Sequence, residues 1–445
     1  MASPRVMIGK TLRNQTPVLD KFGMPVRAGS AASSRRPSDL AQQVVFGIFV
    51  ALAIGVTLLQ KLGYGSSPEK VVPLVVVIAL VAMAVGIVFA KARFRPWRVA
   101  LYLLFLIVSA LTTVIFVADY SPTSLAFYAV LYLPLIVAFE TSERTYRRCM
   151  RFYSNLSLVI VAIVVAQHLV QLTVGWRYWP NLDTLLPSTV LIPNFNYIQP
   201  IVWGMPYMKP NAIGFLEVSY LSQYLAMALI VEIVLFQRAW RMMAFAAAIL
   251  STFAGTGPLL LLVTAPVLVG TTRLRNNVIG VAALLAVGLI ASELGWFDLI
   301  AHRLNEFQHN GTSANMRFVE PLNRIVQAIA QPEGVYSGIG PGMIEKAANF
   351  QWWPITKAVV EYGLIAGLLF YLFFTVALFD APPNVRIAIC VFVWFTFEGS
   401  LLTAINPISC VMFSTMFLID RSEVRRRRRQ EPPAVTPPAQ MQATG

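Results

Sequence analysis

The stretch "GFLEVSYLSQYLAMALIVEIVLFQ", which runs from Gly214 to Gln237, decides the class of this protein. From Tyr220 onward it is mostly apolar, over a length close to the ~20 residues with which a helix crosses the ~30 Å hydrocarbon layer of a bilayer. Glu217 places a carboxylate in the first turn of the predicted helix. The stretch therefore predicts a membrane-spanning helix with an acidic residue at its mouth.

The same apolar pattern recurs along the whole chain of 445 residues. The composition is 57% hydrophobic and 13% charged, with a mean hydropathy of +0.65, whereas soluble proteins carry about a quarter charged residues. We predict an all-α polytopic membrane protein with about twelve transmembrane helices. The predicted spans are 43–60, 71–90, 99–117, 124–139, 155–175, 213–236, 242–254, 257–271, 277–294, 355–378, 385–399 and 402–419.

The distribution of the formal charge of +14 predicts the orientation. Basic residues cluster in alternate short connections between the apolar runs and in the tail "RSEVRRRRRQ". Because arginine and lysine are retained in the cytoplasm, this pattern puts both termini inside and argues against nucleic acid as a partner.

The orientation divides the chain into three parts. Residues 1–40 are predicted to be a disordered cytoplasmic tail, 41–420 the transmembrane domain, and 421–445 a basic, proline-rich cytoplasmic tail. The first apolar run starts too far from the N-terminus for a cleavable signal peptide. Two long connections, about 176–212 and 295–353, fall on the outer side.

The stretch 242–271 fits the predicted arrangement of twelve membrane-spanning helices least well. Only 31 residues separate Arg241 from Arg273, whereas two full crossings need ~40. Gly255, Gly257 and Pro258 interrupt the apolar run, which favours two short or re-entrant helices. A single long span is the alternative, and it would invert the topology of everything that follows.

Two arginines in the second long loop are candidates for substrate binding. Arg303 and Arg317 lie outside, against the usual charge rule. A guanidinium presents a planar fork of donors that suits phosphate oxygens, which are abundant in lipid headgroups. The alternative is that they pair with Glu306 and Glu320 to hold the loop together.

The loops are also rich in aromatic side chains. Such residues form the ordinary interfacial belt of membrane proteins, and their faces also stack on sugar rings. The aromatic residues of the loops and their ends are Trp176, Tyr178, Trp179, Tyr197, Trp203, Tyr207, Trp352 and Trp353.

Two glutamates open apolar spans next to these loops, Glu217 and Glu361. A carboxylate near a helix N-terminus is favoured by the helix dipole by ~0.3–1 kcal/mol, so a structural account exists for both. His302 is a loop residue with the chemistry of a base. The three cysteines have no metal-ligand or redox spacing, and no acidic pair is spaced for a metal, so no metal or cofactor is predicted.

Four segments, taken in order over residues 205–375, resemble the bacterial polysaccharide polymerases of the Wzy type, which are related to O-antigen ligases. The first resembles that family's helix start, the second its small-residue break, the third its paired-arginine stretch and the fourth its GxG turn and E-x-G-x-x-G helix start. These segments are "KPNAIGFLEVSYLSQYLA", "STFAGTGPLLLLVTAPVLV", "RLNEFQHNGTSANMRFVEPLNRIVQAI" and "GIGPGMIEK" with "VVEYGLIAGLLFY".

The chain departs from the family pattern at two places. The break at 255–258 lacks the arginine common there, so it cannot bind phosphate in that way. The stretch "NFQWWPITK" lacks the histidine and asparagine typical of ligases, which favours a polymerase.

The resemblance implies a metal-independent glycosyltransferase in the bacterial inner membrane. Its substrate would be an undecaprenyl-pyrophosphate-linked oligosaccharide, polymerised at the periplasmic face into exopolysaccharide or O-antigen, with a flippase and a chain-length regulator as possible partners. Glu217 or His302 would be the base, and Arg303 and Arg317 would neutralise the leaving pyrophosphate. The other residues expected to contact substrate are Lys209, Trp352, Trp353 and Glu361. The rival readings are a ligase and a non-catalytic lipid-sugar flippase or transporter.

Overall fold

The computed structural model describes residues 38–65, 71–193, 195, 197–201, 206–269, 315, 319–330, 336–344, 353–398 and 400–419. These residues are mostly helical. The helices are α1 (Asp39–Thr57), α2 (Leu74–Phe89), α3 (Pro96–Phe116), α4 (Pro122–Tyr132), α5 (Glu143–Thr173), α6 (Leu182–Leu185), α7 (Val218–Val231), α8 (Ala239–Ser251), α9 (Thr256–Leu268), α13 (Glu320–Ile329), α16 (Pro354–Tyr362), α17 (Leu364–Phe379), α18 (Val385–Glu398) and α19 (Ile405–Cys410).

Short 3₁₀ and π segments and five short strands connect or extend these helices. The 3₁₀ segments are η1 (Leu133–Ile136), η2 (Trp176–Tyr178) and η3 (Ser188–Val190), and the π segments are η4 (Glu232–Phe236) and η6 (Val411–Thr415). The strands are β1 (Gly63–Gly65), β2 (Val71–Pro73), β3 (Ala92–Phe94), β4 (Val137–Glu140) and β5 (Phe417–Leu418).

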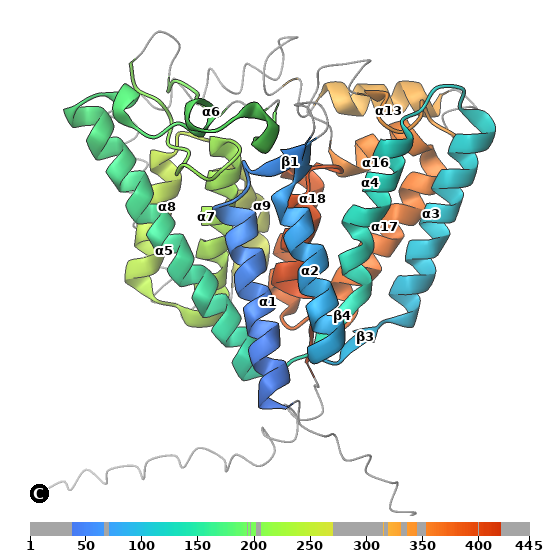
Figure 1. Cartoon of the computed structure of the whole chain (residues 1–445), viewed down its shortest axis with the longest axis horizontal. Helices are drawn as coiled ribbons and strands as arrows, with labels where there is room; N and C mark the ends of the chain where they lie inside the picture. The colour runs from blue at the N-terminus through green and yellow to red at the C-terminus, as the bar shows by residue number, and fades with distance from the viewer. Residues whose placement is uncertain are drawn as a thin grey trace, which may run out of the picture. The chain divides into compact units, whose positions relative to one another are not determined.

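Helix α7 lies among the other helices, and all of its residues are buried. It contacts α5, α8, α9 and α18 (Figure 1). A helix that is apolar all round is stable only inside such surroundings. One of its polar groups is bonded to a neighbouring helix, since Trp394 Nε1 on α18 donates to Gln223 Oε1 at 2.9 Å. The buried Ser222 hydroxyl has no hydrogen-bond partner among the described residues. The stretch that predicts a membrane span thus forms a fully buried helix, as does the shorter α19.

Apolar side chains are exposed in stripes at helical spacing on α2, α3 and α5. Large exposed apolar surfaces are unfavourable in water and normal against lipid tails. Among the described residues, four helices are long and apolar enough to cross a membrane: α1, α3, α5 and α7 with η4. The exposed stripes include Val77, Val81, Val85 and Val88 on α2, Ile107, Leu111, Val114 and Ile115 on α3, and Val165, Leu169 and Leu172 on α5.

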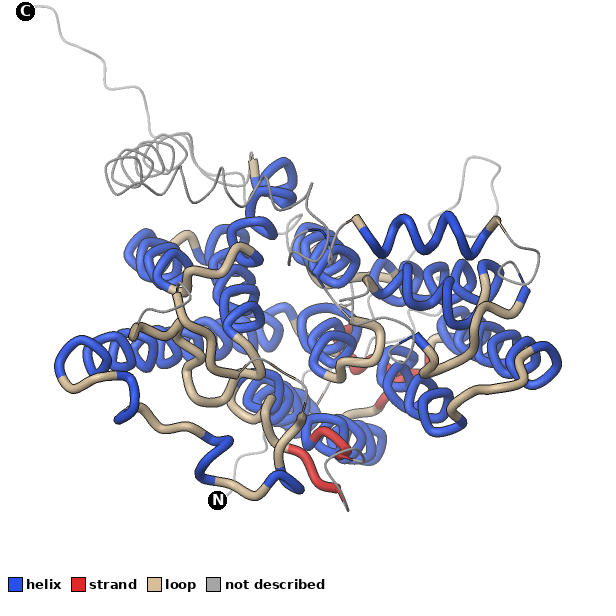
Figure 2. The backbone as a smooth tube through the Cα atoms, turned by 90° about the horizontal axis from the view of Figure 1, so that it is seen from above, coloured by secondary structure: helices blue, strands red, loops and turns tan. Residues whose placement is uncertain are grey.

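Strand pairing shows which connections lie at the same end of the helices. Strand β4 pairs antiparallel with β3 and parallel with β5. The connections α2–α3 and α4–α5 and the segment after α19 therefore meet at one end, which we call the strand end. At the opposite end, the loop end, β1 pairs with β2 and Leu62 bridges to Leu191. Figure 2 looks onto the loop end and shows loops lying across the helices.

A fully buried guanidinium holds the strand end together. Arg98, at the start of α3, is 1% exposed and donates hydrogen bonds to the carbonyl oxygens of Leu135, Thr415 and Asp380 at 2.9–3.1 Å. Its Nε also donates to Asp380 Oδ2 at 3.1 Å, and Arg95 completes the pairing with the same carboxylate. A buried charge is tolerated only when its donors are satisfied, as they are here.

The predicted spans can now be compared with the helices. Apart from 277–294, which lies outside the described residues, each predicted span overlaps at least one helix, although α5 begins twelve residues before its predicted span 155–175 and α19 covers only six residues of 402–419. The stretch 242–271 forms two helices of 13 residues each, α8 and α9, and not one long helix. Their turn lies at the loop end, where Thr256 Oγ1 donates to the Ser219 carbonyl at 3.0 Å.

Two expectations need correction. Glu217 precedes the first turn of α7 and occupies its N-cap position, because the extended backbone there (φ −148°) delays the start of the helix by one residue. The short strands were not predicted, since segments of two to four residues carry no readable period. Of the two predicted tails, residues 1–37 and 420–445 lie outside the described residues.

Candidate functional site

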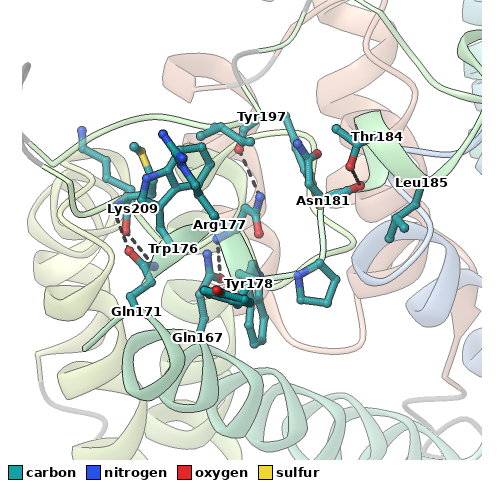
Figure 3. Close-up of a pocket in the computed structure, with 15 residues that line it drawn as sticks. Gln167, Gln171, Trp176, Arg177, Tyr178, Asn181, Thr184, Leu185, Tyr197 and Lys209 are labelled. Carbon is teal, nitrogen blue, oxygen red and sulfur yellow. Dashed lines mark hydrogen bonds between the residues drawn. The ribbon is translucent and has the colours of Figure 1, made fainter. Parts of the chain in front are cut away.

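A pocket of about 460 Å³ opens at the loop end of α5, beneath the connection to α7 (Figure 3). Its volume lies within the ~300–1,000 Å³ of small-molecule sites. The lining combines aromatic rings, amides and two cationic side chains. The lining residues are Gln167, Gln171, Trp176, Arg177, Tyr178, Trp179, Pro180, Asn181, Thr184, Leu185, Tyr197, Ile198, Met208, Lys209 and Asn211.

Two glutamines one helical turn apart on α5 hold the far wall of the pocket. Gln171 bonds the backbone of Met208 in both directions, accepting its N–H at 2.8 Å and donating to its carbonyl at 3.1 Å. Gln167 Oε1 accepts the N–H groups of Asn211 and Ala212 at 3.1 and 3.3 Å. Both amides are buried, so the segment 208–212 is fixed on the end of α5 by satisfied polar groups.

Tyr197 braces the same segment from the other side. Its hydroxyl donates to the Ile213 carbonyl at 2.7 Å, and Asn211 Nδ2 donates to the Tyr197 carbonyl at 3.1 Å. Burial raises the pKa of Tyr197 to about 12, so the hydroxyl stays protonated and keeps donating at neutral pH.

A buried lysine attaches the pocket loop to the end of α1. Lys61 Nζ lies 3.0 Å from Asp183 Oδ1, next to the pocket-lining Thr184, and 5.0 Å from the centre of the Tyr197 ring. The lysine side chain is 4% exposed. The loop is therefore anchored at α1 and α5 at once, which keeps the pocket wall in place without a bound ligand.

The rest of the lining offers contacts of the kind that a saccharide needs. Trp176, Tyr178 and Trp179 all line the pocket, and Figure 3 labels the first two. The indole nitrogen of Trp179 is buried and has no hydrogen-bond partner in the part of the chain that the structure describes. Amide, indole and hydroxyl groups bond sugar hydroxyls, while Arg177 and Lys209 suit acidic groups.

Glu217 does not line the pocket; it follows the pocket-wall segment 208–212 by five residues. The chain passes from Asn211 through Ala212 and Ile213, both with positive φ, and reaches Glu217 at the start of α7. The carboxylate does not cap the helix; its Oε2 accepts the Ser219 hydroxyl at 3.0 Å. The side chain is half-buried, so it is reachable from the loop end, and the helix dipole adds to its stabilisation.

Glu361 lies in a different environment, sealed inside the protein. It is completely buried, 3.7 Å from Lys357 Nζ, and its Oε1 accepts the Gly342 N–H at 3.0 Å. The backbone of the 336–344 segment covers it closely: at Gly363, with φ of 86°, a Cβ would come within 2.8 Å of the Tyr336 carbonyl carbon. Direct contact with a substrate would therefore require this segment to move.

The other predicted residues are placed as follows. Lys209 lines the pocket, as expected for a substrate contact. Trp353 precedes α16 and packs edge-on against Phe397, with ring centres 5.7 Å apart, so it contributes to packing. The structure does not bring Glu217 and Glu361 into one site. The predictions for His302, Arg303, Arg317 and Trp352 fall outside the described residues.

Several pocket residues were missed from the sequence. Gln167 and Gln171 belong to an apolar span, and only their spacing of four, which puts both on one helix face, marks them out. Arg177 and Thr184 lie in the short segments η2 and α6, with Asn181 between them, and such short segments carry no readable period. Among the described residues, no three metal-ligating side chains cluster together.

Comparisons with known proteins identified no relative of this chain. The chain matches no protein-family model, no curated protein and no solved structure.

Proposed function

We propose that this chain is a polysaccharide polymerase that joins lipid-linked oligosaccharide repeat units at one membrane face. The observation that carries the proposal is the aromatic and amide-lined pocket, whose wall segment 208–212 precedes Glu217 by five residues. The sequence resemblance to Wzy-type polymerases supports the same reading. The donor would be an undecaprenyl-pyrophosphate-linked chain, and the pocket would hold the acceptor sugar.

The proposed reaction needs no metal. A hydroxyl of the acceptor sugar attacks the anomeric carbon of the donor, the bond from that carbon to the pyrophosphate oxygen breaks, and Glu217 takes the hydroxyl proton. Pyrophosphate leaves as an anion that cations stabilise. Arg303 and Arg317 are the candidates for that role by sequence, while Lys209 and Arg177 would position an acidic sugar in the pocket.

Deleting the gene in the producing bacterium tests the function and separates its rivals. A lost polymerase leaves single repeat units on lipid that periodate, added to spheroplasts, can oxidise at the outer face. A lost flippase leaves single units that are protected inside. A lost ligase leaves long chains on lipid. Protected single units, or long lipid-linked chains, would therefore overturn the proposal.

The proposed orientation predicts that the loop end is periplasmic. A cysteine at Ser188, an exposed residue of η3, should react with a membrane-impermeant maleimide in intact cells. A cysteine at Ser313, in the second predicted loop, should react as well. A cysteine at Arg386, at the strand end, is the control and should react only after lysis. Protection of both serine positions would contradict the topology.

The proposed pyrophosphate contacts predict a difference between arginine and lysine. Arg303→Lys and Arg317→Lys keep the charge and lose the planar fork, so polymer output should fall about tenfold or more at unchanged protein level. The measurement is polymer per cell, with membrane protein quantified by immunoblot. Full output from both variants would assign these arginines to loop packing.

The unsatisfied indole in the pocket predicts a loss of saccharide affinity. Trp179→Phe keeps an aromatic ring and removes the donor, so binding of a single repeat-unit oligosaccharide should weaken about three- to tenfold. Calorimetry on the purified protein in detergent measures this. Trp97→Phe, an exposed tryptophan on α3, is the matched control and should bind as the wild type does. Equal affinity in both variants would exclude a hydrogen bond from Trp179.

A further inference from the structure

Four arginines gather at the strand end, which is the opposite end of the helices from the pocket. Arg148 and Arg151 lie exposed in the first turns of α5, and Arg238 and Arg241 lie at the start of α8, which packs against α5. We call them the arginine cluster. Arg151 and Arg238 both lie over the Phe236 ring, at 5.7 and 4.7 Å from its centre.

A buried carboxylate sets the geometry of half of the cluster. Glu232, in the π segment that ends α7, is 0% exposed and forms an ion pair with Arg238 and a longer one, at 3.9 Å, with Arg241. Arg241 Nη1 also donates to Ser154 at 3.0 Å and to Asn155 at 2.6 Å on α5. The two guanidiniums of α8 are thus fixed in place before any ligand arrives.

The cluster keeps a surplus of positive charge. Glu232 balances one of the four guanidiniums, which leaves three. Arg148 and Arg151 contact rings, those of Phe46 and Phe236, at 4.0 and 5.7 Å from the ring centres. Arg241 Nε is buried and has no hydrogen-bond partner within the described residues. Exposed positive charge on Arg148 and Arg151 is therefore available to an anion beside α5 and α8.

The surface next to the cluster is apolar. On α8, Trp240 and Met243 are 57% and 60% exposed, and on α5 Val159, two turns beyond Arg151, is 54% exposed. Tryptophan at a membrane interface anchors at headgroup level, with apolar residues on the tail side. In Figure 1, α5 and α8 run side by side from this end.

We propose that the arginine cluster binds the headgroup phosphate of an anionic phospholipid, with the acyl chains lying on the apolar faces of α5 and α8. The alternative is that these arginines only orient the protein in the membrane, because basic residues are retained on the cytoplasmic side. A pair of guanidiniums held by a buried carboxylate, beside an exposed tryptophan and an apolar face, matches both halves of a lipid molecule. This inference does not depend on the proposed function.

Native mass spectrometry on the purified full chain tests the inference. Phosphatidylglycerol and cardiolipin should be retained and phosphatidylcholine released. Arg148→Gln with Arg151→Gln should weaken phosphatidylglycerol binding about thirtyfold, since each surface charge contributes about fivefold. This pair leaves Glu232 with its partners. Lys91→Gln with Arg386→Gln, which removes two charges from the same end outside α5 and α8, should change binding less than about threefold.

Three results would overturn the inference. One is equal retention of phosphatidylcholine, and another is equal phosphatidylglycerol affinity in the two double variants. The third is binding of glycerol phosphate as tight as that of the lipid, which would make the cluster a site for a soluble phosphate. If the Arg148–Arg151 variant does not accumulate, the salt dependence of phosphatidylglycerol binding to the wild-type protein tests the inference instead. Its phosphatidylglycerol affinity must then fall at least tenfold between about 50 and about 500 mM salt, and salt-independent binding would refute the charge contact.

Discussion

Glu217→Gln should abolish polymer while the protein still accumulates in the membrane. The amide keeps the size of the side chain and accepts the Ser219 hydroxyl as the carboxylate does, so the start of α7 should fold normally. It cannot take a proton from an acceptor sugar, and loss of a general base typically costs ~10²–10⁴ in rate. Single repeat units on lipid should accumulate and polymer should disappear, as measured by lipid extraction and gel analysis.

Two controls separate chemistry from structure in this experiment. Ser219→Ala removes the hydroxyl that donates to Glu217 Oε2 and leaves the charge of Glu217, so it should lower output modestly. Glu143→Gln changes an exposed glutamate at the strand end and should have no effect. Normal polymer from Glu217→Gln would show that the carboxylate only stabilises the helix start, by ~0.3–1 kcal/mol.

Lys357→Met should destabilise the protein by ~3–5 kcal/mol, because it leaves Glu361 as an unpaired buried carboxylate. Both side chains are at most 4% exposed, so water cannot compensate for the lost partner. The double variant Lys357→Met with Glu361→Gln removes both charges and keeps an acceptor for the Gly342 N–H. It should recover most of the loss in thermal unfolding of the purified protein.

The exposed pair Arg147 and Glu143 on α5 has the same spacing and is the control, since Arg147→Met should not measurably change the unfolding midpoint. The double variant also decides the role of Glu361. If it folds and makes normal polymer, the pair is structural. If the double variant folds and makes no polymer, Glu361 acts on substrate. A single Lys357→Met variant with wild-type stability would exclude the buried ion pair.

The helical class and the positions of most helices could be predicted from the sequence. Apolar runs and the residues that interrupt them are local properties of the sequence. Helices α1, α3, α5 and α7 could therefore be located without knowing their neighbours. The interruption around Gly255 correctly indicated two short helices, although α8 ends at Ser251 and Gly257 and Pro258 lie inside the first turn of α9, where proline is tolerated. The aromatic content of the connection after α5 likewise pointed to the region of the pocket.

Only the tertiary structure shows which polar residues of the apolar spans are buried and which groups they bond. Arg98 reads as one more basic loop residue, yet it bonds three carbonyls that are distant in sequence, since folding brings the ends of α3, η1 and η6 together. Gln167 and Gln171 become a pocket wall, and Glu361 a sealed ion pair, for the same reason. A sequence shows the type and spacing of side chains. Burial and hydrogen-bond partners depend on contacts between distant segments, and these exist only once the helices have packed.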